Sequence, residues 1–226
     1  MNDGVNFGGG EPTPTRSRLL ICIVVSLTVS GFANAWAGYK SVKVKVEAAN
    51  QYPSHQQQGS ITIAADAYDS REKLKSAFDL KELDDAGIRP VHVIVTNQGE
   101  DPIEITSAEV RLLDSSNRSL EPLAIEEVLR AVLYKDKGDP PQKRAPSRLP
   151  IPKGSGRKGD AFEIEADLLN KSLKDSRFGP HTTMAGFVFF KVPENQGRLA
   201  GYKLYIPQIR NLRTGQELLF FEIELK

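Results

Sequence analysis

The sequence predicts a mainly β protein, an antiparallel β-sandwich with a helical and loop insertion between two β halves. Residues 41–47 alternate apolar with charged residues at period two, which is typical of a half-buried strand. Residues 91–96 and 187–190 are rich in β-branched and aromatic residues, which favour strands as well. Residues 123–179 change to helical spacing and contain a proline-rich stretch, so they predict the insertion.

The first β half is expected to contain four strands. They cover residues 41–47, 60–64, 91–96 and 103–113. The polar residues 50–59 are expected to form a loop between the first two strands. Residues 97–102 are a strong turn signal, because they combine Asn, Gly, Asp and Pro. We therefore expect the last two strands to pair as a hairpin.

A charged stretch, residues 66–85, separates the second strand from the third. We expect it to be irregular or briefly helical and to pack a few apolar side chains on a sheet, namely Tyr68, Leu74, Phe78, Leu80 and Leu83. Its seven acidic residues suggest calcium as a ligand, but their spacing matches no EF-hand loop. Four basic residues lie among them. A solvated surface that neutralises its own charge is the favoured interpretation.

Two helices are expected in the insertion. The first has one apolar face, formed by Ile125, Val128, Leu129, Val132 and Leu133. The second is expected to begin with a capping box of Asp160 and Glu163. Its predicted buried face consists of Phe162, Ala166, Leu169 and Leu173. A strand is the alternative for this second segment, because residues 162–168 also alternate, but residues 167–174 do not suit a strand.

The second β half is expected to begin with a central strand at residues 184–192, which is apolar on both faces. Further strands are expected at residues 202–206 and 218–225, which gives seven or eight strands in all. Consecutive aromatic residues such as Phe189 and Phe190 must point to opposite faces of a sheet. Where the other sheet does not cover one of these faces, we expect the inserted helices to cover it.

Residues 1–37 are expected to be a secretory signal peptide with a disordered leader. Arg16 and Arg18 precede an apolar run of about eleven residues. Small residues mark the expected cleavage region at Ala33, Ala35 and Ala37. Because a spanning helix needs roughly 20 mostly apolar residues, cleavage is favoured over an uncleaved inner-membrane anchor. The chain is therefore expected to be exported to the periplasm, the outer envelope or the medium, with residues 38–226 as one domain.

Charge and cysteine content narrow the possible partners. The formal net charge of +1 gives no overall attraction to nucleic acid or membrane. The single cysteine, Cys22, lies inside the apolar run, so the exported chain would contain no disulfide. Ile21 stands where a lipoprotein signal carries a small residue, which disfavours lipidation of Cys22.

The most specific surface signal is the basic segment, residues 135–158. Two acidic residues stand among its eight basic ones, which are Lys135, Lys137, Lys143, Arg144, Arg148, Lys153, Arg157 and Lys158. Prolines favour an extended conformation there. Such a segment could contact anionic lipid headgroups, and a solvated insertion without a partner is the alternative. Residues 137–160 contain no aromatic side chain, so binding to single-stranded nucleic acid is not expected.

The sequence contains no recognisable catalytic constellation. The histidines His55, His92 and His181 lack the spacing of a metal site, and no G-x-S-x-G motif occurs. His92 lies between Val91 and Val93 in a predicted strand and should face the opposite side, exposed to solvent or satisfied by hydrogen bonds. We therefore expect no cofactor, no metal and no enzymatic activity, and an enzyme with an unrecognised site remains the alternative.

Two segments resemble the small exported immunoglobulin-like domains of bacterial envelope proteins. Residues 90–114 read PVHVIVTNQGEDPIEITSAEVRLLD and residues 180–193 read PHTTMAGFVFFKVP. Those domains share a strand ending in T/V-N-x-G, a hairpin and a later strand that ends in F-x-V-P. The resemblance implies an immunoglobulin-like sandwich that binds or scaffolds an envelope protein or peptide. Peripheral attachment to anionic lipid or polymer through the basic segment is the alternative function.

Overall fold

The elements below all belong to one compact unit, Ala37–Lys226. The computed structural model describes residues 38–134, 160–174, 176–193, 197–218 and 220–226. The predicted signal peptide and the basic segment lie outside these residues. Within the described ranges, none of the helices has the length and the apolar content needed to cross a bilayer.

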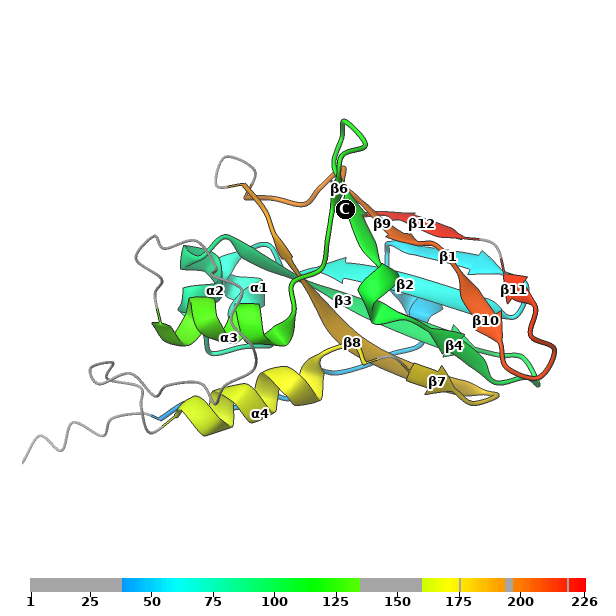
Figure 1. Cartoon of the computed structure of the whole chain (residues 1–226), viewed down its shortest axis with the longest axis horizontal. Coiled ribbons are helices and arrows are strands. Elements are labelled where there is room, and N and C mark those ends of the chain that lie inside the picture. The colour runs from blue at the N-terminus through cyan, green and yellow to red at the C-terminus, as the bar shows by residue number, and fades with distance from the viewer. Residues whose placement is uncertain (1–37, 135–159, 175, 194–196, 219) are drawn as a thin grey trace, which may run out of the picture. The chain divides into compact units, whose positions relative to one another are not determined.

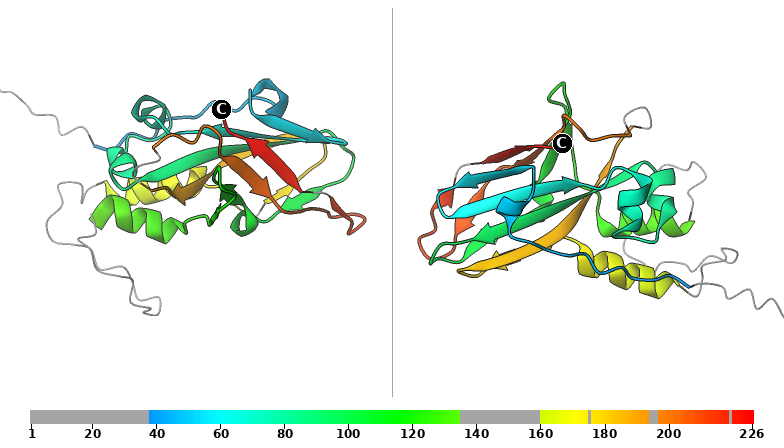
Figure 2. Two further views of the ribbon diagram at one scale, coloured as in Figure 1. Left: turned by 90° about the horizontal axis from the view of Figure 1, so that it is seen from above. Right: turned by 180° about the vertical axis from the view of Figure 1, so that it is seen from behind.

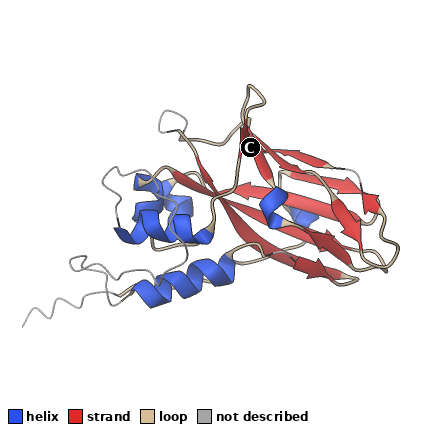
Figure 3. Cartoon of the chain, viewed as in Figure 1, coloured by secondary structure: helices blue, strands red, loops and turns tan. Residues whose placement is uncertain are grey.

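The described residues form three antiparallel sheets of four strands each (Figures 1 and 3). The prediction that the protein is mainly β is therefore confirmed. Sheet A has the order β1(His55–Gln58), β2(Ile61–Ala67), β3(Ile88–Asn97), β8(Thr182–Lys191). Sheet B has the order β11(Glu217–Leu218), β10(Ile209–Asn211), β4(Ile103–Ile105), β7(Ser176–Phe178). Sheet C has the order β12(Phe221–Glu224), β9(Lys203–Ile206), β5(Arg111–Leu113), β6(Ser119–Leu120).

Sheets B and C have the same order of chain segments, so together they form one interrupted layer. β4 continues into β5, β9 into β10 and β11 into β12. The first interruption is a 3-10 turn, η2(Ser107–Glu109). The second contains Pro207, which has no N–H to donate to a ladder. The single strands expected at residues 103–113 and 218–225 are therefore wrong, because each segment is divided between the two sheets.

The helices gather at one end of the long strands β3 and β8 (Figures 1 and 2). They are α1(Arg71–Lys75), α2(Lys81–Asp85), α3(Ile125–Tyr134) and α4(Ala161–Lys171), whereas the 3-10 turn η1(Ala49–Gln51) lies against β1, β2 and β3 of sheet A. The Ser70 hydroxyl caps α1 by accepting from the Lys73 N–H at 3.3 Å. Glu127 caps α3, because its carboxylate accepts from the Ala124 N–H at 3.2 Å. The brief helices expected in residues 66–85 and the helix expected from Ile125 are confirmed.

Two large hydrophobic cores lie on the two faces of sheet A, and a smaller cluster of Ala49, Ala64 and Ile94 lies beneath η1. The sandwich core joins sheet A to sheets B and C and contains Val93, Phe178 and Phe190 among many others. The helical core lies on the other face, where Phe189 packs against α1 to α4. β3 is consequently buried along its whole length. The expectations that Phe189 and Phe190 face opposite sides and that helices cover one side are both confirmed.

Three predictions about the first β half are wrong. Residues 41–47 are extended but belong to no strand, and the predicted loop at residues 50–59 contains η1 and β1. The predicted hairpin does not form, because β2 and β8 occupy both edges of β3. β4 pairs instead with β7 and β10. A turn signal shows where the chain reverses, but it does not show which strand will be the partner.

α4 is a helix, as favoured, but its predicted cap and its predicted buried face are wrong. The Asp160 side chain makes no capping hydrogen bond, and its φ of −97° and ψ of −3° are already helical. Phe162 is 78 % exposed and Leu169 is 42 % exposed, whereas Leu173 is buried in the sandwich core just after the end of the helix. The helix instead buries Ile164 and Leu168 in the helical core. α4 therefore has two apolar stripes. The periodicity of the sequence favoured the stripe with Phe162 and Leu169, which is the exposed one.

β8 lies at the edge of sheet A, although residues 184–192 predict a central strand. Its residues 186–190 are buried on both faces, as expected. Non-strand segments cover its outer edge, where isolated bridges join Pro122 to Phe190 and Ser172 to Phe187. An edge strand covered in this way has the same apolar composition as a central one.

Candidate functional site

The site residues named from the sequence lie outside the residues that the structure describes. These are the cleavage region Ala33, Ala35 and Ala37 and all eight basic residues of the segment 135–158. Their roles therefore stay predictions. The described chain resumes after these segments at Gly38 and Asp160, and an ideal Cβ on Gly38 would lie 3.2 Å from the Asp160 carboxylate.

A cavity of about 300 Å³ lies beside the outer edge of β8. Its walls come from η2 and β5, from the connection between β6 and α3, from the end of α4 and from β8. The apolar part of the wall includes Leu123, Leu173 and Phe187. The polar part is formed by Ser107, Arg111, Glu121 and Ser172. We call this space the β8 cavity. Its size is at the lower limit for small ligands, which is roughly 300 Å³.

Two main-chain contacts hold the walls of the β8 cavity on the strand. The Leu173 N–H donates to the Phe187 carbonyl at 2.9 Å, and the Leu123 N–H donates to the Phe189 carbonyl at 2.8 Å. Gly186 permits the first contact, because an ideal Cβ there would lie 2.5 Å from the Cα of Leu173. A lone glycine inside an aromatic strand is a sequence signal of such a close approach.

Arg111 supplies the positive charge of the β8 cavity. Its Nη1 donates to the carbonyls of Ala108 at 2.6 Å and Val110 at 3.0 Å. Both acceptors are neutral, and no ion pair joins Arg111 to a carboxylate within the described part of the chain. The guanidinium therefore keeps its full charge beside an apolar wall, where it can bind a carboxylate in a bidentate manner.

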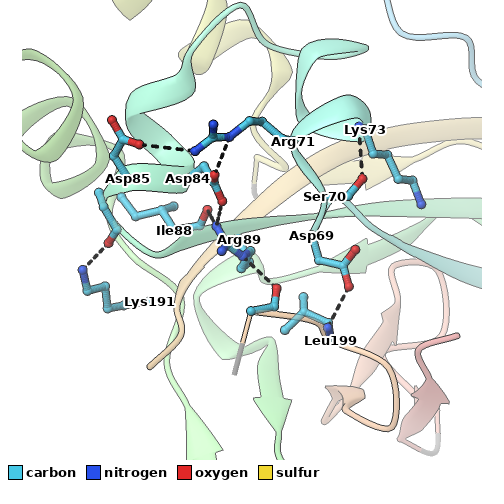
Figure 4. Close-up of polar contacts among 12 residues, drawn as sticks. Asp69, Ser70, Arg71, Lys73, Asp84, Asp85, Ile88, Arg89, Lys191 and Leu199 are labelled. Carbon is cyan, nitrogen blue, oxygen red and sulfur yellow. Dashed lines mark hydrogen bonds and ion pairs between the residues drawn. The ribbon is translucent and has the colours of Figure 1, made fainter. Parts of the chain in front are cut away.

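A second hollow, of about 230 Å³, is lined by charged side chains of the α1–α2 region. Asp84 accepts from Arg71 Nε at 3.0 Å and pairs with Arg89 Nη1 at 3.0 Å (Figure 4). Arg71 also approaches Asp85 at 3.9 Å, and Arg89 Nε donates to the Gly197 carbonyl at 3.1 Å. Both guanidiniums are thus already paired inside the protein. This cluster fastens α2 and the segment after β8 to β3.

The acidic stretch expected to neutralise its own charge does so in part. Asp66 pairs with Lys73 at 2.5 Å, within the stretch itself. Asp69 accepts from the main-chain N–H of Leu199 at 2.7 Å (Figure 4). The Arg198 guanidinium lies 3.9 Å from the same carboxylate. In the residues that the structure covers, no three His, Cys, Asp or Glu side chains are close enough to hold a metal ion.

Among the described residues, the two large pKa shifts belong to His92 and Tyr68, which lie in or beside the helical core rather than at a cavity. Burial lowers the pKa of His92 to about 4, and burial raises the pKa of Tyr68 to about 12. The His92 ring stacks on Phe187 with 4.5 Å between centroids. Neither His92 nor Tyr68 lines either hollow. The sequence placed His92 opposite Val91 and Val93, which is confirmed, and the helices bury it there.

No family model matches this chain, and no curated protein matches it. Among solved structures, the YjhA protein of Bacillus subtilis is 12 % identical, with 77 % of this chain and 97 % of that one covered and a TM-score of 0.42. A candidate lipoprotein of B. subtilis, YcdA, is 14 % identical over 75 % of this chain and 38 % of that one, with a TM-score of 0.36. A functionally unknown Listeria monocytogenes protein is 12 % identical over 68 % of each chain, with a TM-score of 0.31. None of these values assigns the chain to a family.

Proposed function

We propose that this chain is an exported, non-enzymatic accessory module of the cell envelope that binds a short segment of another envelope protein in the β8 cavity. The observation that carries the proposal is the cavity itself, a largely apolar space beside a strand edge whose charged lining is the Arg111 guanidinium, not paired with a described carboxylate, and the exposed carboxylate of Glu121. Export is supported by the signal-peptide pattern of residues 1–37. We also propose that sheet A and the layer formed by sheets B and C are an immunoglobulin-like sandwich.

The dimensions and charge of the β8 cavity specify the ligand. A space of about 300 Å³ accepts one medium apolar side chain together with the main chain that carries it. Leu123, Leu173 and Phe187 would surround that side chain. Arg111 would pair with a carboxylate next to it, either an acidic side chain or the carboxyl end of a peptide. The favoured ligand is therefore a short apolar peptide segment with one carboxylate.

The test uses the purified protein as recovered from cells, a displayed library of random peptides and fluorescence anisotropy of the selected peptides. Ala108→Trp narrows the mouth of the cavity and Arg111→Gln removes its charge, so each should weaken binding at least tenfold. Ala200→Trp and Arg210→Gln are matched controls at exposed positions outside the cavity, and they should bind as the unaltered protein does.

Two results would count against the proposal. One is a library from which no peptide is enriched above background. The other is a set of selected peptides that bind Ala108→Trp and Ala200→Trp equally well.

The second candidate function is attachment to an anionic envelope surface through the basic segment 135–158. The favouring observation is its excess of basic residues on a chain that is nearly neutral overall. Sedimentation with vesicles of phosphatidylglycerol and phosphatidylcholine tests this function at low and at high salt. Salt-sensitive binding that disappears when residues 135–158 are deleted supports it, and binding that survives the deletion refutes it.

A further inference from the structure

The segment that leads into the domain is an extended chain without a sheet partner. We call residues 38–48 the N-terminal strap. Val42 and Val44 are half-buried, and Lys43 and Lys45 are exposed, so the strap keeps the alternation of a strand. Nevertheless, residues 40–46 make no main-chain hydrogen bond to any residue that the structure describes. Unpaired donors and acceptors in a row are a template for another strand.

The strap is held in place rather than loose. The Tyr39 hydroxyl donates to Asp167 Oδ2 at 2.5 Å, and the Ser41 hydroxyl donates to Asp167 Oδ1. Asp167 is 5 % exposed and also pairs with Lys171 at 2.7 Å. Figure 2 shows the strap running along α4 on its way to η1. At the far end, the Glu47 N–H donates to the Tyr52 hydroxyl at 3.3 Å.

A segment fixed at both ends has already lost much of its conformational entropy. When a partner strand pairs with the strap, little further conformational entropy of the strap is therefore lost. Strand addition to such an edge gives affinity through the main chain, and the alternate side chains give specificity. The polar contacts of the strap thus prepare it for binding.

We propose that the N-terminal strap receives an extended segment of a partner protein as an added strand, with acidic residues opposite Lys43 and Lys45. Opposite charges stabilise directly facing positions of two strands, and like charges destabilise them. Lys43 forms no ion pair with a described residue. Lys45 pairs with Glu47 of the strap itself at 2.6 Å, and both side chains are exposed, so a partner carboxylate can compete for it.

The same charges disfavour a second copy of this chain as the partner in the register centred on Val44. Two straps that paired antiparallel about Val44 would place Lys43 opposite Lys45 in both directions. That arrangement brings like charges face to face. This surface is separate from the β8 cavity, so a failure of one proposal leaves the other standing.

The experiment uses a fluorescent hexapeptide with alternating valine and glutamate and, as its control, the same peptide with lysine in place of glutamate. The glutamate peptide should bind at least tenfold more tightly than the lysine peptide. Reversal of both strap charges, Lys43→Glu with Lys45→Glu, should invert that preference. Lys75→Glu is the matched control, because Lys75 is an exposed lysine of α1 with no partner in the contacts above.

Hydrogen exchange separates strand addition from simple charge attraction. With the glutamate peptide bound, the alternate amides of residues 42–46 that face the added strand should exchange at least tenfold more slowly, and the amides of β10 should be unchanged. Slower exchange confined to the strap supports the proposal. Binding without protection of residues 42–46, or no binding at millimolar peptide, overturns it.

Discussion

At the scale of single residues, His92 shows how the helical layer changes a side chain's chemistry. It is 3 % exposed, its ring stacks on Phe187, and Tyr68 lies edge-on at 6.2 Å. Burial lowers its pKa from 6.5 to about 4, while Asp66 opposes this shift and Lys73 adds to it. The folded protein therefore binds a proton at His92 only at about pH 4 and below, although the unfolded chain binds it near pH 6.5.

The first prediction concerns stability in acid. As pH falls from about 6.5 to about 4, the unfolded state binds a proton at His92 and the folded state does not, so the free energy of unfolding falls. The loss from this group is about 2–3 kcal/mol by pH 4.5. His92→Phe keeps the aromatic stack and should remove that part of the slope. Urea unfolding at pH 7.5 and at pH 4.5 measures it.

His181→Asn is the control for this prediction. His181 is an exposed histidine with a φ of 52°, a conformation that asparagine tolerates. This variant should keep the acid sensitivity of the unaltered protein. If His92→Phe lost stability in acid as steeply as His181→Asn, the slope would have to come from other groups.

At the scale of elements, α2 depends on one carboxylate. Asp84 lies between Arg71 and Arg89, and the Arg89 side chain is only 10 % exposed. A buried charge that loses its partner destabilises a protein strongly, whereas an exposed ion pair contributes little. Asp84 and Asp85 are adjacent residues of the same type, but we expect them to contribute very differently to the free energy of unfolding.

The second prediction compares those neighbours. Asp84→Asn should lower the free energy of unfolding by about 2–4 kcal/mol, because Arg89 keeps its charge in a poorly solvated place. Asp85→Asn should change it by less than about 0.5 kcal/mol, since its contact with Arg71 is exposed and 3.9 Å long. Chemical denaturation of both variants decides it. Equal losses would show that Asp84 is not the critical clamp.

Elements with one unambiguous pattern could be predicted from the sequence, and elements whose identity depends on a neighbour could not. β3 and α3 each have a single strong period, and both are present. α4 has two apolar stripes, and only contact with the helical core selects Ile164 over Phe162. The strap has the alternation of a strand but no partner in the described chain. Strand pairing depends on two segments, whereas the alternation of residues describes only one of them and does not identify its partner.

The β8 cavity could not be predicted from the sequence for the same reason. Its walls come from segments as distant as Ser107 and Phe189. Gly186 was the one local signal, because it interrupts an otherwise bulky strand. The predicted basic segment and cleavage region are local charge and composition patterns, so they could be named residue by residue without any knowledge of the fold.

At the scale of the whole molecule, β3 and β8 belong to both cores at once. Phe189 enters the helical core and Phe190 enters the sandwich core, and one peptide bond joins them. Loss of either core would expose one face of the same two strands to water. The helical layer and the sheets should therefore unfold together, as a single cooperative unit.

The third prediction tests this coupling. Phe189→Ala and Phe190→Ala should each lower the free energy of unfolding by about 3–5 kcal/mol, because each leaves a large cavity in a closed core. Far-UV circular dichroism should show one transition in both variants. Hydrogen exchange should report the same loss in α3 and in β9, although each substitution touches one core only. Phe162→Ala, at an exposed position of α4, should lower the free energy of unfolding by less than about 0.5 kcal/mol.

If Phe189→Ala accelerated exchange in α3 while β9 kept its protection, the helical layer would be an independently opening unit. The shared strands would then not couple the two faces.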